Sequence, residues 1–430
     1  MLYLNLIELN EINFEFVAKY IDKYPGRFKG FEKLKSFNQI TTKSENLYEQ
    51  IEPWIQWPSV HTCKSFAEHK VFRLGDIVNF SGDQIFELIE RSGYSVGCVS
   101  PMNAKNNLKR PAFFIPDPWT ATKPDNSLIS RSLHQALRQA VNDNSQGKID
   151  FTTYLTLIFV ILTKTRKKNW IRYATLFLKR KKRWNKALFL DLLLSDIFIS
   201  LKNKNNENFS CLFLNAFAHI QHHYILNSEM YDGELKNDIN YLNADEDPVL
   251  DAIELYDEII YDLLKIFRQK FIFATGLRQV PVDRKITYYR LRNHNQFLSK
   301  LGLENFSVNP RMTRDFLINF NSSDDLETAL AILSNASCDG IKLFGEIEAR
   351  EASLFVTLTY SLPVAGKSII GYENHVIDLS EEFIFVAIKN GHHDSVGYAI
   401  TNYETEILKN NDHVYMIGKE ILHFFKVQKA

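Results

Sequence analysis

Three histidines gather within five residues at the end of an apolar run. His219, His222 and His223 follow residues 211–214, whose apolar character predicts a buried strand. On a helix, spacings of three and four place His219 on one face with each of the later histidines. Imidazole nitrogens at this spacing suit zinc or another transition metal better than magnesium. The pattern therefore predicts a metal-binding or catalytic site at this position.

Two more stretches carry side chains of the same chemistry. The first strand, expected over residues 2–9, ends among Glu8 and Glu11. A strand that ends in acidic residues before a helix is a ligand site in many α/β sheets. Near the carboxyl terminus, another apolar strand is followed by His392 and His393. The alternative for the two glutamates is a purely structural role, as helix charges stabilised by the dipole.

Polar, aromatic and reactive residues are densest in a third stretch, residues 48–76. Segments of this stretch, of the histidine-rich stretch and of the stretch near the carboxyl terminus resemble motifs of the alkaline-phosphatase superfamily. Residues 62–71, Thr-Cys-Lys-Ser-Phe-Ala-Glu-His-Lys-Val, are similar to the Thr-Gly and His-Gly-Val/Ile that follow the nucleophile helix in its phosphodiesterase, nucleotide-pyrophosphatase and sulfatase branch. Asn215 and His219 fall on the family's Asp-x-x-Gly-His motif. The pair Gly391-His392 resembles the Gly-His near the carboxyl terminus of the family, whose histidine is the last metal ligand. The resemblance implies an α/β fold with a doubly wound, mostly parallel central sheet flanked by helices and a helical cap insertion.

The chain departs from these motifs where the family's chemistry is concentrated. Pro53 stands at the position of the nucleophile, and Asn10 and Asn215 stand at the positions of two metal-binding aspartates. Residues 274–276, Ala-Thr-Gly, supply neither the Asp nor the His expected there. Enough ligands remain for one divalent metal ion, with zinc favoured, and not for two. The expected ligands are Glu8 or Glu11, His219, and His392 or His393.

The expected catalytic roles follow from the missing hydroxyl nucleophile. We expect Glu52 to activate water, with Ser59 as the nearest hydroxyl and a weaker nucleophile candidate. His222 and His223 are further candidate catalytic groups. The side chains expected to line the substrate pocket are Gln56, Trp57 and Arg73. An arginine suits bidentate recognition of an anion.

A helical, basic segment over residues 125–205 divides the expected α/β core into 1–124 and 206–430. Its apolar run, 154–162, is too short to span a bilayer, which predicts a buried helix. Residues 164–186 include many basic side chains, several aromatics and no acidic residue. They predict a cap that binds a polyanion or lies on an anionic membrane surface. The alternative is a solvated helical face whose aromatics turn to the core.

Composition limits the class of protein. A chain of 430 residues that is 45% hydrophobic can bury a large α/β core, as one domain with an insertion or as two domains. Its formal net charge is zero, so attraction to nucleic acid is not a property of the whole molecule, and we expect no specific nucleic-acid partner. The four cysteines form no Cys-x-x-Cys pair, which predicts reduced thiols in a cytoplasmic protein. From about residue 310 the pattern changes to α+β.

Two functions fit these expectations. The leading hypothesis, implied by the resemblance, is a hydrolase or group transferase acting on a phosphate or sulfate ester, with an anionic small molecule or a glycan as substrate and surface glycan metabolism as its setting. The alternative is a non-catalytic member of the fold that binds an anionic glycan or a lipid-linked sugar through the basic cap. Asn215 and Thr275 favour the alternative, whereas the clustered histidines favour hydrolysis.

Overall fold

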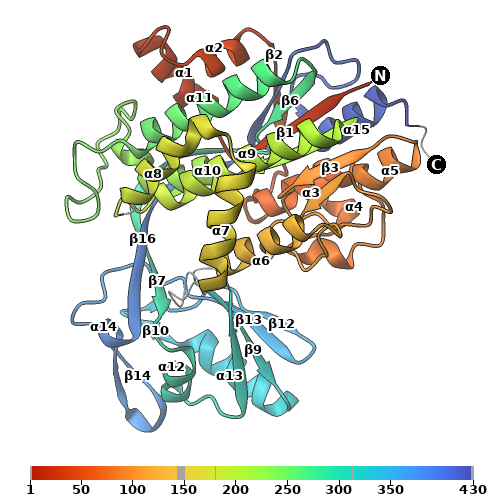
Figure 1. Cartoon of the computed structure of the whole chain (residues 1–430). Helices are drawn as coiled ribbons and strands as arrows, with labels where there is room; N and C mark the ends of the chain where they lie inside the picture. Colours follow the sequence, from red (N-terminus) through yellow and green to blue (C-terminus); the bar gives the residue numbers. More distant parts are fainter. Residues whose placement is uncertain (1, 143–150, 180, 312–313, 428–430) are drawn as a thin grey trace. The chain divides into compact units, whose positions relative to one another are not determined.

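A computed structural model describes residues 2–142, 151–179, 181–311 and 314–427. The chain forms two compact units (Figure 1). Unit 1 contains Met1–Pro281 and Gly391–Ala430, and unit 2 contains Val282–Asn390. The sequence pattern did not predict unit 2 as a separate body, because only its change to α+β character was visible.

Unit 1 is built on an eight-stranded sheet with the order β18-β2-β17-β6-β1-β5-β3-β4. Strands β6, β1, β5, β3 and β4 run parallel to one another, and β17 is antiparallel to both β6 and β2. This confirms the predicted mixed α/β class with a mostly parallel central sheet. The strands are β1 (Leu4–Leu9), β2 (Asn38–Lys43), β3 (Val96–Val99), β4 (Phe113–Ile115), β5 (Phe209–Leu214), β6 (Lys270–Ala274), β17 (Val396–Thr401) and β18 (Asp412–His413).

Helices flank this sheet, and every residue of β1 and β5 is buried, as expected for parallel strands covered on both faces. Helices α3, α5 and α15 pack against one another, as do α9, α10 and α11. The helices of unit 1 are α1 (Phe14–Lys23), α2 (Lys29–Lys35), α3 (Pro53–Thr62), α4 (Phe66–His69), α5 (Ile85–Arg91), α6 (Leu128–Asn142), α7 (Phe151–Lys164), α8 (Trp170–Leu178), α9 (Asn185–Asn205), α10 (Ala216–Tyr224), α11 (Pro248–Ile266) and α15 (Tyr415–Phe424).

The basic segment 125–205 folds into α6, α7, α8 and α9, and it belongs to unit 1. Its role as a cap inserted into the core stays a prediction. The expected burial of the apolar run 154–162 is wrong for most of its large side chains, because Leu155, Ile158, Phe159 and Leu162 are each at least half exposed. No helix within the described residues is long and apolar enough to cross a membrane.

Unit 2 has its own hydrophobic core and a four-stranded antiparallel sheet with the order β12-β13-β9-β8. The chain enters it in β7 (Arg278–Leu291) and leaves it in β16 (Phe383–Asp394), which pair with each other. The other elements are β8 (Phe306–Pro310), β9 (Asp315–Phe320), β10 (Ser337–Cys338), β11 (Ile341–Lys342), β12 (Glu348–Arg350), β13 (Ser353–Thr357), β14 (Ser368–Ile370), β15 (Val376–Asp378), α12 (His294–Leu301), α13 (Ser323–Asn335) and α14 (Leu379–Glu382).

Candidate functional site

The carboxyl ends of β1, β5 and β6 meet at one edge of the central sheet. The strands are parallel neighbours in register, with Leu9 opposite Leu214 and Glu8 opposite Ala274. Residues that follow these strands are therefore brought together, as at ligand sites of open α/β sheets generally. They include Glu11 after β1 and the helix α10, with its histidines, after β5.

Backbone geometry fixes the side chain of Glu11 at this edge. Its φ of 59° lies in the left-handed region, which is unfavourable for a residue with a Cβ. Backbone hydrogen bonds hold it there: its N–H donates to the Thr275 carbonyl at 3.0 Å, and its carbonyl accepts from the Gln279 N–H at 3.2 Å. A strained residue held by its neighbours is typical of functional sites.

Glu11, His222 and His393 form a cluster, called here the edge cluster, in which three ligand atoms make a nearly equilateral triangle. Glu11 Oε2 lies 3.1 Å from His222 Nε2 and 3.1 Å from His393 Nε2, and the two imidazole nitrogens are 3.2 Å apart. Bonds of about 2.0–2.1 Å to a tetrahedral ion place ligand atoms about 3.3 Å apart. The triangle therefore matches one face of a tetrahedral zinc site, and the donor set fits the ion.

The second nitrogen of each imidazole faces a hydrogen-bond acceptor. His393 Nδ1 lies 3.1 Å from Glu52 Oε2, and His222 Nδ1 lies 3.4 Å from the carbonyl of Gly391. Metal-binding histidines usually donate their other ring N–H to a carboxylate or a backbone carbonyl, which fixes the tautomer. Both histidines are therefore arranged to direct Nε2 at the centre of the edge cluster.

Glu11 has separate partners for its two carboxylate oxygens. Oε1 accepts a hydrogen bond from Asn10 Nδ2 at 2.8 Å, and Oε2 accepts one from Gln279 Nε2. Asn10 is held in turn by Trp57, whose Nε1–H donates to Asn10 Oδ1 at 2.8 Å. Gln279 was not predicted as a site residue, because no motif marks a glutamine that reaches the site from a neighbouring strand.

The charges of the edge cluster stabilise one another. Burial alone would raise the pKa of the Glu11 carboxyl, but the imidazoles of His393 and His222 hold that pKa well below its usual range. Burial alone would lower the pKa of His393, but the carboxylates of Glu11 and Glu52 outweigh it and raise the pKa to about 10. Without metal, the proton on the His393 imidazolium thus supplies the positive charge that the carboxylates of Glu11 and Glu52 favour at this position.

The two amides at the expected aspartate positions bond to each other. Asn10 Nδ2 donates to Asn215 Oδ1 at 2.8 Å. Two carboxylates at this separation would repel each other without a cation, whereas two amides satisfy each other. The amide pair therefore adds no negative charge next to the edge cluster.

Helix α10 carries the three clustered histidines in different directions. His222 joins the edge cluster, while His219 and His223 stack edge to face with ring centroids 4.8 Å apart. The start of the helix is held by Asp191, whose Oδ2 accepts from the Ala216 N–H at 2.6 Å. The expected ligand roles of His219 and His392 stay predictions, and the edge cluster takes its last histidine from His393.

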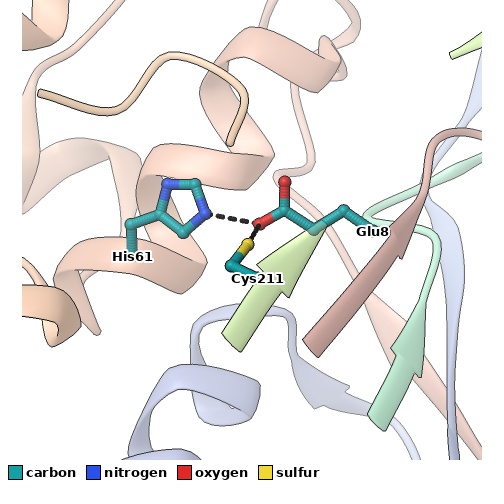
Figure 2. Close-up of side chains that lie close together, drawn as sticks. All are labelled: Glu8, His61 and Cys211. Carbon is teal, nitrogen blue, oxygen red and sulfur yellow. Dashed lines mark hydrogen bonds and ion pairs between the residues drawn. The ribbon is translucent and has the colours of Figure 1, made fainter. Parts of the chain in front are cut away.

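Glu8 lies in a different cluster, called here the core cluster, with His61 and Cys211 (Figure 2). Its Oε1 is 2.6 Å from His61 Nε2 and accepts from the Cys211 thiol at 3.3 Å, and Oε2 accepts from the Met102 N–H at 3.4 Å. All three side chains are fully buried. Because side chains alternate along a strand, Glu8 follows Leu4 and Leu6 into the core beside α3, away from Glu11.

Ser59 belongs to neither cluster, and its hydrogen bonds direct its proton away from a base. The Val71 N–H donates to His69 Nδ1 at 3.0 Å, so the neutral ring carries its proton on Nε2. Nε2 lies 3.0 Å from Ser59 Oγ, which donates to the Ile55 carbonyl at 3.1 Å. His69 therefore acts as a donor to this hydroxyl.

The expected pocket residues occupy three different environments. Trp57 is fully buried beneath Asn10, and Gln56, also buried, donates from Nε2 to the Gln50 carbonyl at 2.8 Å. The Arg73 guanidinium lies 4.5 Å from the ring centroid of Phe72. Trp57 thus contacts the edge cluster indirectly, through its hydrogen bond to Asn10. The substrate-binding roles of Gln56, Trp57 and Arg73 stay predictions.

No family model matches the chain, and no curated protein does so. Solved structures similar to it include phosphonoacetate hydrolase from Sinorhizobium meliloti 1021, at 10% identity over 99% of this chain and 95% of that one, with a TM-score of 0.46. Murine ectonucleotide pyrophosphatase/phosphodiesterase 5 is 8% identical over 100% and 96%, with a TM-score of 0.48. Alkaline phosphatase from the Antarctic bacterium TAB5 is 9% identical over 99% and 99%, with a TM-score of 0.42. Because these TM-scores lie below 0.5, we base the function on the residues of this chain.

Proposed function

We propose that unit 1 is a hydrolase of phosphate or sulfate esters that uses one zinc ion, held by Glu11 Oε2, His222 Nε2 and His393 Nε2. The observation that supports it most strongly is the triangle of these three atoms, with sides of 3.1, 3.1 and 3.2 Å. Two imidazoles and one carboxylate with a free fourth position are the ligands of catalytic zinc sites in several hydrolases. Closed structural sites instead use four protein ligands.

Zinc bound there would supply a Lewis acid for the ester oxygens and a water of lowered pKa. The residues around it hold the site in shape. Glu52 Oε2 lies 3.1 Å from His393 Nδ1, and its negative charge favours a proton on that nitrogen, which leaves Nε2 free to bind. Gln279 and Asn10 orient the Glu11 carboxylate. Glu52 is thereby a positioning residue for His393. Its expected role as the base that activates water stays a prediction, as do proton transfer by His223 and a glycan as the esterified substrate.

Metal content and hydrolysis together test this function. Purified protein, stripped with a chelator and reloaded, is expected to hold one zinc per chain by elemental analysis. His222→Ala and His393→Ala should each abolish uptake, whereas His423→Ala, which removes a solvent-exposed histidine paired with Glu406, should retain it. Hydrolysis of 4-nitrophenyl phosphate, bis(4-nitrophenyl) phosphate and 4-nitrophenyl sulfate should follow the zinc content. Unchanged zinc in both edge variants would contradict the assignment.

The amide pair supports a second candidate function, the binding of an anionic glycan or lipid-linked sugar without hydrolysis. Asn10 and Asn215 are neutral and hydrogen-bond to each other, so they do not supply the carboxylates that a second metal ion would need. Without a second ion, the charge on the leaving oxygen is not stabilised as in a two-metal site. Stoichiometric zinc at the edge cluster, with none of the three esters hydrolysed, would favour this candidate. Zinc-dependent turnover of any one of them would exclude it.

A further inference from the structure

Helix α7 turns an apolar face outward. Leu155, Ile158, Phe159 and Leu162 are 50%, 53%, 59% and 58% exposed. Their spacing of three, four and seven residues places them on one side of the helix. Side chains of this kind are normally buried, and a contiguous group of them on a surface marks an interaction site.

Helix α8 repeats the arrangement. Ile171 and Leu178 are 81% and 79% exposed, and Trp170 and Phe177 lie beside them on the same helical face. The opposite face is buried: the Tyr173 hydroxyl donates to Asp196 at 3.0 Å. The helix is therefore fixed to unit 1 by one side and presents the other to solvent.

The segment that carries these two faces contains basic residues and no acidic ones. No Asp or Glu occurs between residues 151 and 190. Arg166, Lys168, Arg172 and Lys182 form ion pairs with acidic side chains of α9, α11 and the segment that leads into α11, which hold the segment in place. Six further cations make no ion pair with an acidic residue in the described part of the chain, namely Lys164, Lys167, Lys179, Lys181, Arg183 and Lys186. Arg180 lies outside the described residues.

We propose that the outward faces of α7 and α8 bind an anionic membrane surface. The apolar side chains would enter the boundary between headgroups and acyl chains, and the lysines beside the helix ends would lie next to lipid phosphates. With 14 and 9 residues, these helices are suited to lie in the interface and are too short to span it. The proposal does not depend on the edge cluster and goes beyond the hydrolase function, because it places the protein at a lipid surface.

Charge complementarity favours this occupant over a second copy of the chain. A symmetric dimer through these faces would bring the same patch of each copy together and so oppose like charges. An anionic lipid surface provides both the apolar layer and the negative charge that the two faces require. A soluble acidic polymer would satisfy the lysines alone.

Vesicle flotation of the full chain tests the proposal. The protein is mixed with vesicles of phosphatidylcholine, alone or with phosphatidylserine, at low and high salt. Three double variants are compared with the wild type: Ile171→Ser with Leu178→Ser, Ile158→Ser with Leu162→Ser, and Lys179→Ser with Lys181→Ser. The matched controls are Ile370→Ser with Val376→Ser, which are 64% and 61% exposed in unit 2, and Lys33→Ser with Lys123→Ser.

We expect the wild type and both controls to float with anionic vesicles and to be released by salt, while each of the three variants binds about tenfold more weakly or worse. Unchanged thermal unfolding and far-UV circular dichroism in the variants would show that they are folded. The proposal is overturned by equal binding to neutral and anionic vesicles, by variants that bind like the wild type, or by the absence of vesicle binding. Retention on a heparin column without vesicle binding would likewise overturn it and indicate an acidic polymer.

Discussion

The edge cluster and the core cluster use the same chemistry with opposite consequences. Their glutamates, Glu8 and Glu11, are three residues apart in the chain, and each contacts histidine. In the core cluster the closest contact, His61 Nε2 to Glu8 Oε1, is 2.6 Å, a length typical of a strong hydrogen bond. In the edge cluster all three sides of the triangle are 3.1 or 3.2 Å, which suits a shared ion.

Access to solvent separates the two clusters further. Glu8 and His61 are fully buried, whereas His222 and His393 are 27% and 12% exposed. Within the described residues, His61 Nδ1 has no hydrogen-bond partner, while an oxygen atom lies 3.1 Å from Nδ1 of His393 and 3.4 Å from Nδ1 of His222. We infer that the core cluster contributes to stability and that the edge cluster contributes to function. The types of the ligand residues alone do not make a catalytic metal site. The metal and its substrate must also reach the site from solvent, and each histidine must be held in the tautomer that leaves the binding nitrogen without a proton.

Breaking the core cluster should have the largest effect. His61→Ala leaves the Glu8 carboxylate without its main partner in a fully buried position. We expect the free energy of unfolding to fall by about 3 kcal/mol, because the buried Glu8 carboxyl loses its closest hydrogen-bond partner. Urea unfolding followed by circular dichroism measures it, with His423→Ala as the control. A loss below about 1 kcal/mol would show that the pair is not important for stability.

His69 extends the comparison to a buried histidine without a bonded carboxylate. Burial lowers the pKa of His69 to about 4, against about 6.5 in an unfolded chain. Between these values the unfolded state binds a proton that the folded state does not, so stability is complete above pH 6.5 and is lost as the pH falls toward 4. The loss should reach about 3 kcal/mol.

His69→Gln provides the matched test of that titration. Glutamine can keep a donor to Ser59 but does not titrate, so the unfolding free energy of this variant should depend less steeply on pH between 6.5 and 4. Urea unfolding at several pH values measures both proteins. Parallel pH profiles for the two would contradict the assigned pKa.

Breaking the edge cluster should affect activity more than stability. His393→Ala removes one vertex of the triangle, and we expect ester hydrolysis to fall about 100-fold or more, equivalent to about 2.7 kcal/mol. Because Glu11 keeps its hydrogen bonds from Asn10 and Gln279 and its contact with His222, the free energy of unfolding should fall by only about 1–2 kcal/mol. Hydrolysis rates and urea unfolding on the same preparation measure the two effects. A larger stability loss than for His61→Ala would reverse the roles of the two clusters.

The smallest effect is expected when the core cluster is replaced by apolar side chains. Glu8→Leu combined with His61→Phe removes both partners of the shortest contact, and it leaves the Cys211 thiol and the Met102 N–H, at 3.3 and 3.4 Å from Glu8, without that acceptor. Replacing a buried polar pair by apolar side chains of similar size is often nearly neutral and the two remaining contacts are long, so the free energy of unfolding should change by about 1 kcal/mol, and zinc content and hydrolysis should be retained. A double variant as unstable as His61→Ala would show that packing around the pair, rather than its charge, decides the cost.

Local sequence patterns were sufficient to predict individual buried strands and the ligand types. The apolar runs 2–9 and 211–214 predict buried strands, and polar residues directly after them predict a site at the carboxyl edge. The parallel arrangement of the sheet is implied by the family resemblance. The donor chemistry of His222, His393 and Glu11 was also present in the sequence, because side-chain type alone determines which ions a residue can bind.

Only the tertiary structure decided which of these side chains meet. His222 and His393 are 171 positions apart, and no local pattern specifies a contact over that distance. Glu8 and Glu11 were equivalent candidates in the sequence, and the fold places them in different clusters: the strand period directs Glu8 into the core, and the left-handed turn holds Glu11 at the edge. The outward apolar faces of α7 and α8 were likewise decided by packing, since helical periodicity shows that a face exists but not whether protein or solvent covers it.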